Sequence, residues 1–134
     1  MSTFGGPLDT GVGPDEGLAL VSKSNIDSLK EYFLNSQPPN TTGLARRLNP
    51  DSFYVACRWE YNITPQETLL RSLAKVTNVT KGHPSFGKLA MAQPIDWGPS
   101  EDTGRVADLS PGLAKFLGLS TDDQVEVTLL VKIE

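Results

Sequence analysis

Cysteine and histidine are almost absent from this chain of 134 residues, which holds one of each, Cys57 and His83. A single cysteine excludes a disulfide within the chain, and the pair excludes a zinc site built from Cys and His. Any catalysis must therefore use carboxylates, hydroxyls, Arg or Lys. We expect no metal and no cofactor.

Long hydrophobic runs are also missing. The longest apolar stretches, residues 18–21 and 128–131, are far below the roughly 20 residues that a membrane-spanning helix needs. The Gly-rich stretch 1–13 lacks a basic region followed by an apolar run, so it is not predicted to be a signal peptide. This leaves open a cytoplasmic location, another export route, or a chain that starts at a mature end.

Positive charge is scarce: 12 Lys and Arg stand against 16 Asp and Glu, a formal net charge of −4. The chain therefore lacks the basic patch of a nucleic-acid-binding protein. Its length fits one domain with a single core, and we expect a monomeric domain over residues 1–134.

Strand patterns recur along the chain. Residues 17–22 have the pattern of a short buried strand, 73–78 and 88–95 are expected to be extended, and a closing strand starts at Val125 and alternates to Ile133. Pro94 predicts that its strand lies at an edge or carries a bulge.

The strand predicted for residues 52–60 alternates most clearly. One face is expected to pack on the core and carries Phe53, Val55, Cys57 and Trp59. The other face is expected to be polar and carries Tyr54, Ala56, Arg58 and Glu60. The sequence thus predicts a half-buried strand.

Helix signals are few and short. An amphipathic helix is predicted for 25–35 with a capping box starting at Ser24, and a helical turn follows the capping box at Thr64. Residues 111–117 hold a small helix that Ser110 caps and Gly118 ends. Short strands separated by short helices favour a small, mainly β barrel with helical insertions.

The C-terminal half carries a specific motif. Asp96-Trp97-Gly98-Pro99 is followed by Gly104-Arg105-Val-Ala-Asp108-Leu109-Ser110, then by the helix 111–117 and the last strand. This order resembles double-psi β-barrel domains of the rare lipoprotein A type, which are related to expansins. The resemblance covers residues 72–134 well and 1–20 faintly.

The resemblance implies a six-stranded double-psi β-barrel with short helices and a helical insertion near residues 24–50, within the divergent stretch 23–51. The family's Ala-His-x-x-Leu-Pro segment is not recognisable, and His83 lies too late in the chain to replace its histidine. The loss of this segment favours a non-catalytic binding module, whereas the retained Asp96 motif favours an enzyme.

Some members of the family cleave peptidoglycan as lytic transglycosylases, and related barrels are endoglucanases or expansins. The resemblance therefore implies Asp96 as general acid, in a wall of low polarity formed by Trp97 and Pro99 that raises its pKa. A hydrolase needs a second carboxylate, for which Asp9, Glu16 and Glu60 are candidates.

Five residues are predicted to bind substrate. Tyr54 and Trp97 are candidates for stacking on a sugar ring, with Tyr54 expected to be the more exposed. Arg58 is placed to hydrogen-bond a sugar or to pair with Glu60, and Thr10 belongs to a turn that matches the family's N-terminal loop.

Each site assignment has a structural alternative. Asp96 would then satisfy backbone N–H groups of the 97–99 turn, and Asp9 and Glu16 would be solvated loop carboxylates. Asp108 is expected to be structural, fixing the loop and the helix start through Arg105.

We therefore expect an extracellular or periplasmic barrel that cleaves cell-wall glycan, peptidoglycan or a cellulose-like polymer. The first alternative is an expansin-like module that binds glycan without cleaving it. A protein-binding or inhibitor barrel is the second.

Overall fold

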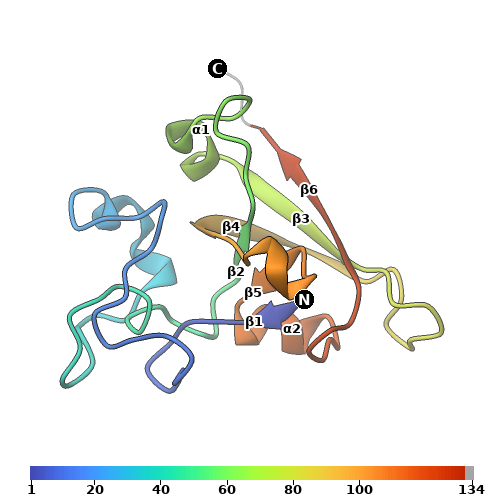
Figure 1. The fold of residues 1–134 in the computed structure, drawn as a ribbon, viewed down its shortest axis with the longest axis horizontal. Coiled ribbons are helices and arrows are strands. Elements are labelled where there is room, and N and C mark those ends of the chain that lie inside the picture. Colours follow the sequence, from blue (N-terminus) through green and yellow to red (C-terminus); the bar gives the residue numbers. More distant parts are fainter. Residues whose placement is uncertain (132–134) are drawn as a thin grey trace.

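A six-stranded mixed sheet organises the molecule, whose computed structural model describes residues 1–131 (Figure 1). Its strands are β1 (Ser2–Thr3), β2 (Tyr54–Cys57), β3 (Leu73–Asn78), β4 (Leu89–Trp97), β5 (Ala107–Leu109) and β6 (Val125–Leu130). The spatial order is β1-β5-β2-β4-β3-β6. The mainly β class predicted from the sequence is confirmed.

The sheet combines parallel and antiparallel strand pairs. β1 pairs with β5 and β2 with β4 in parallel, whereas β2–β5, β4–β3 and β3–β6 are antiparallel. Among the residues that the structure describes, β1 and β6 are the edges and do not pair with each other, so the sheet is not closed. Ile133, predicted for the last strand, lies outside the described residues.

The helices are short: η1 (Ile26–Tyr32), α1 (Gln66–Leu70), η2 (Glu101–Thr103) and α2 (Pro111–Phe116). Helix α2 follows its prediction closely: the Ser110 hydroxyl accepts a hydrogen bond from the Leu113 N–H at 3.2 Å, and Gly118 has φ 70° just past the end. No helix in residues 1–131 is both long and apolar enough to cross a membrane.

The other two helix starts differ from the sequence prediction. Helix η1 is a kinked 3-10 helix with Asn25 at its N-cap and no side-chain capping bond. The Asn25 side chain accepts a hydrogen bond from the preceding Ser22 N–H at 2.8 Å instead. The capping box at Ser24 is therefore wrong. Helix α1 has Pro65 at its N-cap, so the box at Thr64 does not form either.

Two hydrophobic clusters pack on the two faces of strand β2. The first packs α2 against the sheet through residues such as Val55, Leu113 and Leu117. The second joins Tyr54 and Ala56 to the N-terminal part of the chain. A strand forms within the predicted residues 52–60, but β2 is buried on both faces, so the prediction that it is half-buried is wrong.

The chain from residue 7 to residue 50 contains no strand and gathers beside the sheet, away from β3 and β6 (Figure 1). The strand predicted for residues 17–22 does not form. Its apolar residues Leu20 and Val21 are nevertheless buried, because they enter the second cluster from a loop. The apolar pattern therefore predicted correctly that these residues are buried, but wrongly that they belong to a strand.

Candidate functional site

Two aspartates flank one alanine in a row across neighbouring strands. Ala56 on β2 is in register with Asp96 on β4 and with Asp108 on β5, and Asp108 is in register with Ser2 on β1. Residues in register on neighbouring strands project from the same face of a sheet. The two aspartate Cα atoms are two strand spacings apart, roughly 10 Å, with only a methyl group between them.

A bulge in β4 puts Asp96 into this row. Val55 is in register with Pro94, yet the next residue, Ala56, is in register with Asp96, so Ile95 is the extra residue. A bulge changes the direction in which the following side chains point. Without it, Ile95 would stand opposite Ala56. The prediction of a bulge at Pro94 is confirmed, in a central strand rather than at an edge.

A groove of 550 Å³ opens over the row. Among residues 1–131, its lining includes four carboxylate residues and no Lys or Arg. The residues concerned are Ser2, Thr3, Phe4, Asp9, Gly11, Val12, Glu16, Ala56, Asp96, Trp97, Gly98, Pro99, Ser100 and Asp108. The structure therefore brings together the three predicted catalytic residues, Asp96, Glu16 and Asp9, and adds Asp108.

The Asp96 carboxyl group is held by one oxygen only. Its Oδ1 accepts hydrogen bonds from the backbone N–H of Ala19 at 2.8 Å and of Trp97 at 2.9 Å. Within residues 1–131, Oδ2 has no hydrogen-bond partner. Burial raises the pKa of Asp96 against the two backbone bonds, which lower it, and the charges of Glu16 and Asp108 raise it further.

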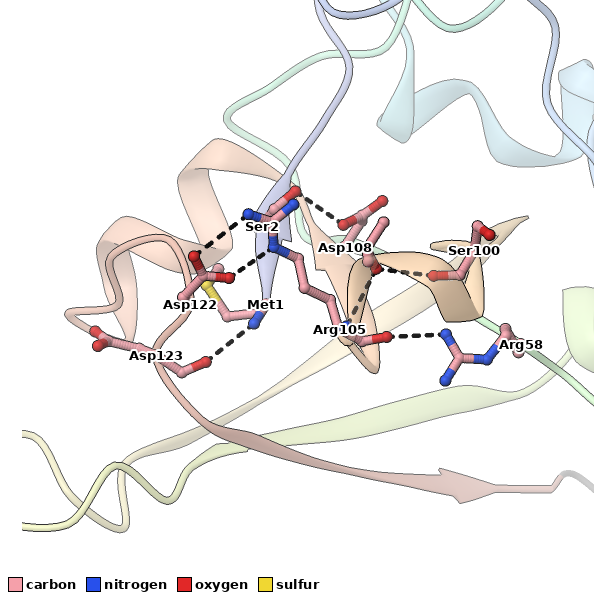
Figure 2. Close-up of polar contacts among 9 residues, drawn as sticks. Met1, Ser2, Arg58, Ser100, Arg105, Asp108, Asp122 and Asp123 are labelled. Atoms are coloured by element: carbon pink, nitrogen blue, oxygen red, sulfur yellow. Dashed lines mark hydrogen bonds and ion pairs between the residues drawn. The ribbon is translucent and has the colours of Figure 1, made fainter.

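Asp108 has a similar arrangement on the other side of Ala56. Its Oδ1 accepts from the Ser2 hydroxyl at 2.9 Å (Figure 2). Burial raises the pKa of Asp108, although Ser2 and the charge of Arg105 lower it. The expected hydrogen bond from Arg105 to Asp108 is not formed, because the Arg105 guanidinium donates to Asp122 at 2.7 Å instead.

The other predicted acids are bound by their own loops. Asp9 accepts from the N–H groups of Gly5 at 2.7 Å and Gly11 at 2.8 Å, one on each oxygen. Glu16 is exposed and accepts from the Gly13 N–H at 3.4 Å. Both residues line the groove, but the carboxylate of Asp9 is used to hold the loop of residues 5–11. Thr10 is exposed and lies outside the residues lining the groove.

Tyr54 does not reach the groove surface. It is fully buried, and its hydroxyl donates to the Phe4 carbonyl at 2.7 Å. The expectation that it is the more exposed aromatic residue is wrong, because the second cluster covers this face of β2. Its ring is therefore unavailable for stacking on a sugar.

Arg58 is occupied by backbone carbonyls. Its Nη1 donates to Pro99 at 2.7 Å and to Arg105 at 2.8 Å, and Figure 2 shows the second of these bonds. The guanidinium thus fixes the loop that carries η2. Glu60 is exposed and faces a second hollow beside Trp97. No hydrogen bond or ion pair joins Arg58 to Glu60 in the described part of the chain.

Of the two aromatic residues that line the groove, Phe4 is buried, whereas Trp97 has 45% of its area exposed. Its indole Nε1 donates to the Trp59 carbonyl at 3.0 Å, and the Trp59 indole donates to the Asp96 carbonyl at 2.8 Å. These two bonds fix the Trp97 ring relative to Asp96. A fixed, half-exposed indole beside a carboxyl group is suited to stacking on a sugar.

Cys57 does not line this groove. Burial raises the pKa of the Cys57 thiol to about 12, so the thiolate that would react is not formed near neutral pH. No cluster of three or more His, Cys, Asp or Glu side chains in residues 1–131 is arranged to hold a metal ion.

Neither the models of known protein families nor the curated proteins searched contain a match to this chain.

The sequence did not indicate that Asp108 lines the groove or that Ala56 lies between the two aspartates. The sequence shows the alternation of apolar and polar residues around Ala56. It does not show that β2 pairs with both β4 and β5. The one available signal was Asp108 itself, a carboxylate between two buried residues of a short strand, Ala107 and Leu109.

Proposed function

We propose that this protein is a double-psi β-barrel that binds a polysaccharide in the groove over Ala56 and cleaves it with Asp96 as general acid. The motif from Asp96 to Ser110 supports the family, and the six strands are compatible with its barrel. The observation that carries the activity is the Asp96 carboxyl group, anchored by Oδ1, with Oδ2 unpartnered among the described residues and the pKa raised by burial.

A general acid must keep its proton until the glycosidic bond breaks. Burial favours the protonated form of Asp96, and the two backbone N–H groups on Oδ1 leave Oδ2 as the oxygen that carries the proton. As the bond between C1 and the glycosidic oxygen breaks, this proton moves to that oxygen. Asp96 is left as a carboxylate.

Asp108 is the best-placed partner for a hydrolytic reaction. It would take a proton from the water that attacks C1, while Ser2 holds its other oxygen. Two carboxyl groups about 6.5–9.5 Å apart leave room for that water and invert the configuration at C1. A Cα separation of roughly 10 Å across two strand spacings is compatible with this range. We therefore favour inverting hydrolysis over a reaction with a covalent intermediate.

The charge of the groove favours a neutral glycan. Asp9, Glu16, Asp96 and Asp108 face it without a compensating Lys or Arg in the lining. An anionic polymer would be repelled, since like charges at short range oppose binding. Of the cell-wall glycans expected from the resemblance, a cellulose-like or N-acetylated backbone fits better than an acidic one.

The test is release of soluble fragments from cellulose, chitin and peptidoglycan by the wild type and by Asp96→Asn, Asp108→Asn and Asp102→Asn. Asp102 lies exposed on η2 outside the groove and serves as the matched control. Loss of a general acid lowers the rate by about 10²- to 10⁴-fold, so Asp96→Asn should be nearly inactive and Asp102→Asn should retain full activity.

The products separate the mechanisms. Hydrolysis leaves each new reducing end with an added water, whereas a lytic transglycosylase leaves an anhydro end one water lighter, which mass spectrometry distinguishes. Anhydro products with an active Asp108→Asn variant would refute the role given to Asp108. Equal release by wild type and Asp96→Asn would refute the general acid.

A non-catalytic glycan-binding module is the second candidate. The Asp96 carboxyl group lines the groove with Oδ2 unpartnered among the described residues, so it would accept or share hydrogen bonds with sugar hydroxyls without cleaving the chain. Co-sedimentation of wild type and Asp96→Asn with a polymer, without fragments from either, would establish this candidate over the enzyme.

A further inference from the structure

A second hollow of 540 Å³ lies beside the groove and shares Trp97 with it. The residues lining it are Arg58, Trp59, Glu60, Tyr61, Asn62, Trp97 and Glu101. Both hollows fall within the range of about 300–1,000 Å³ that is typical of small-molecule pockets. One side chain, the Trp97 indole, thus forms part of the wall of two adjacent pockets.

The second hollow is tied to the catalytic groove by specific contacts. The Trp59 indole, which lines it, donates to the Asp96 carbonyl at 2.8 Å. Tyr61 lies near enough to Asp96 that this carboxyl group raises the Tyr61 pKa, after the larger effect of burial. A ligand in the hollow would therefore lie next to the residue that we propose as the acid.

The polar groups around the hollow are available to a ligand. The side chains of Glu60 and Asn62 are exposed and make no hydrogen bond within the described residues. A carboxylate and an amide supply both acceptors and donors for hydroxyl groups. With the Trp97 ring beside them, they form the mixture of aromatic and hydrogen-bonding groups that binds sugars.

We propose that this hollow is a second sugar subsite, so that the ligand is a glycan chain crossing Trp97 from the Asp96 groove. This inference rests on the proposed function. The groove then recognises an oligosaccharide or an internal stretch of polymer, because one free sugar fills only one hollow. Glu60 and Asn62 bind the sugar farther from the bond that is cleaved.

Calorimetric titration with cello-oligosaccharides and chitin oligosaccharides of two to six residues tests this. Asp96→Asn is the parent chain, because it should bind without cleaving. Glu60→Gln with Asn62→Ala is added to it, two exposed positions where the fold tolerates the change. The matched control is Phe86→Ala, an exposed aromatic residue outside both hollows.

In the parent and in Phe86→Ala, affinity should rise with chain length. In the Glu60→Gln, Asn62→Ala variant it should be about tenfold weaker for the longest ligands, the effect of losing one or two hydrogen bonds. The disaccharide should bind this variant and the parent equally.

The remaining outcomes separate the two proposals. If affinity depends on length but the hollow variant behaves as the parent, the second subsite is wrong and the groove assignment stands. If the affinity of the parent for oligosaccharides does not change with their length, the second subsite is also wrong and the groove assignment stands. If no oligosaccharide binds the parent or the wild type, the glycan function fails and this inference fails with it.

Discussion

Replacing Tyr54 by Phe tests how the N-terminal wall of the groove is held. The Tyr54 hydroxyl donates at 2.7 Å to the carbonyl of Phe4, a residue that lines the groove. Burial raises the pKa of this phenol, so it remains a donor throughout the range in which the protein would be assayed. Tyr54→Phe removes this bond and keeps the ring.

The change in the free energy of unfolding depends on the contacts that remain in Tyr54→Phe and on the carbonyl that loses its donor. The Phe4 and Tyr54 rings, 5.0 Å apart in an edge-to-face arrangement, should remain in contact. The Phe4 carbonyl loses its donor, and a buried polar group without a partner costs about 1–3 kcal/mol. We therefore expect Tyr54→Phe to lower the free energy of unfolding by about 1–3 kcal/mol.

Urea denaturation followed by circular dichroism measures this change, and the midpoint should fall with an unchanged slope. Tyr61→Phe is the matched control, because the Tyr61 hydroxyl donates no hydrogen bond among the described residues. It should leave the midpoint nearly unchanged. A Tyr54→Phe variant as stable as the wild type would show that the Phe4 carbonyl finds another donor, and the reasoning would be refuted.

Three further changes test the fold around the groove. Ser110→Ala removes the acceptor for the N–H groups of Leu113 and Tyr54, and should lower the free energy of unfolding by about 1–3 kcal/mol; a loss below 0.5 kcal/mol in urea would contradict the cap. Gly5→Ala should lower the free energy of unfolding by about 1–3 kcal/mol, because φ is +88° at this position. An unchanged midpoint of thermal unfolding would contradict this expectation. Asp96→Asn should stabilise the protein at pH 7.5, with the gain vanishing toward about pH 4. The sign follows because burial raises the Asp96 pKa, so the folded state binds its proton more tightly and loses stability as pH rises through that pKa; a gain that is constant with pH would contradict it.

Local signals in the sequence predicted the elements that local interactions determine. Helix α2 begins at its Ser110 cap and stops before Gly118 because the cap, the proline and the glycine all act within a few residues. Strand β3 coincides with the predicted residues 73–78. The motif around Asp96 singled out a residue that lines the groove in the structure.

The rest depended on contacts distant in sequence. Tyr54 has the alternation of a solvent-facing residue, and it is buried only because the chain before residue 50 covers it. Arg105 lies three residues before Asp108, yet its guanidinium donates to Asp122 on a later loop. Strand pairing of β2 with β4 and β5 placed Asp96 and Asp108 on either side of Ala56, and no local pattern encodes that pairing.

The hydrogen bonds that join the two indoles to the backbone give the protein a built-in optical reporter. The chain contains two tryptophans, Trp59 and Trp97, and both lie beside Asp96. All of its indole emission therefore originates within one small region. A ligand that displaces water from Trp97 should change the emission spectrum without any label, so that occupancy of the groove is read directly from the unmodified protein.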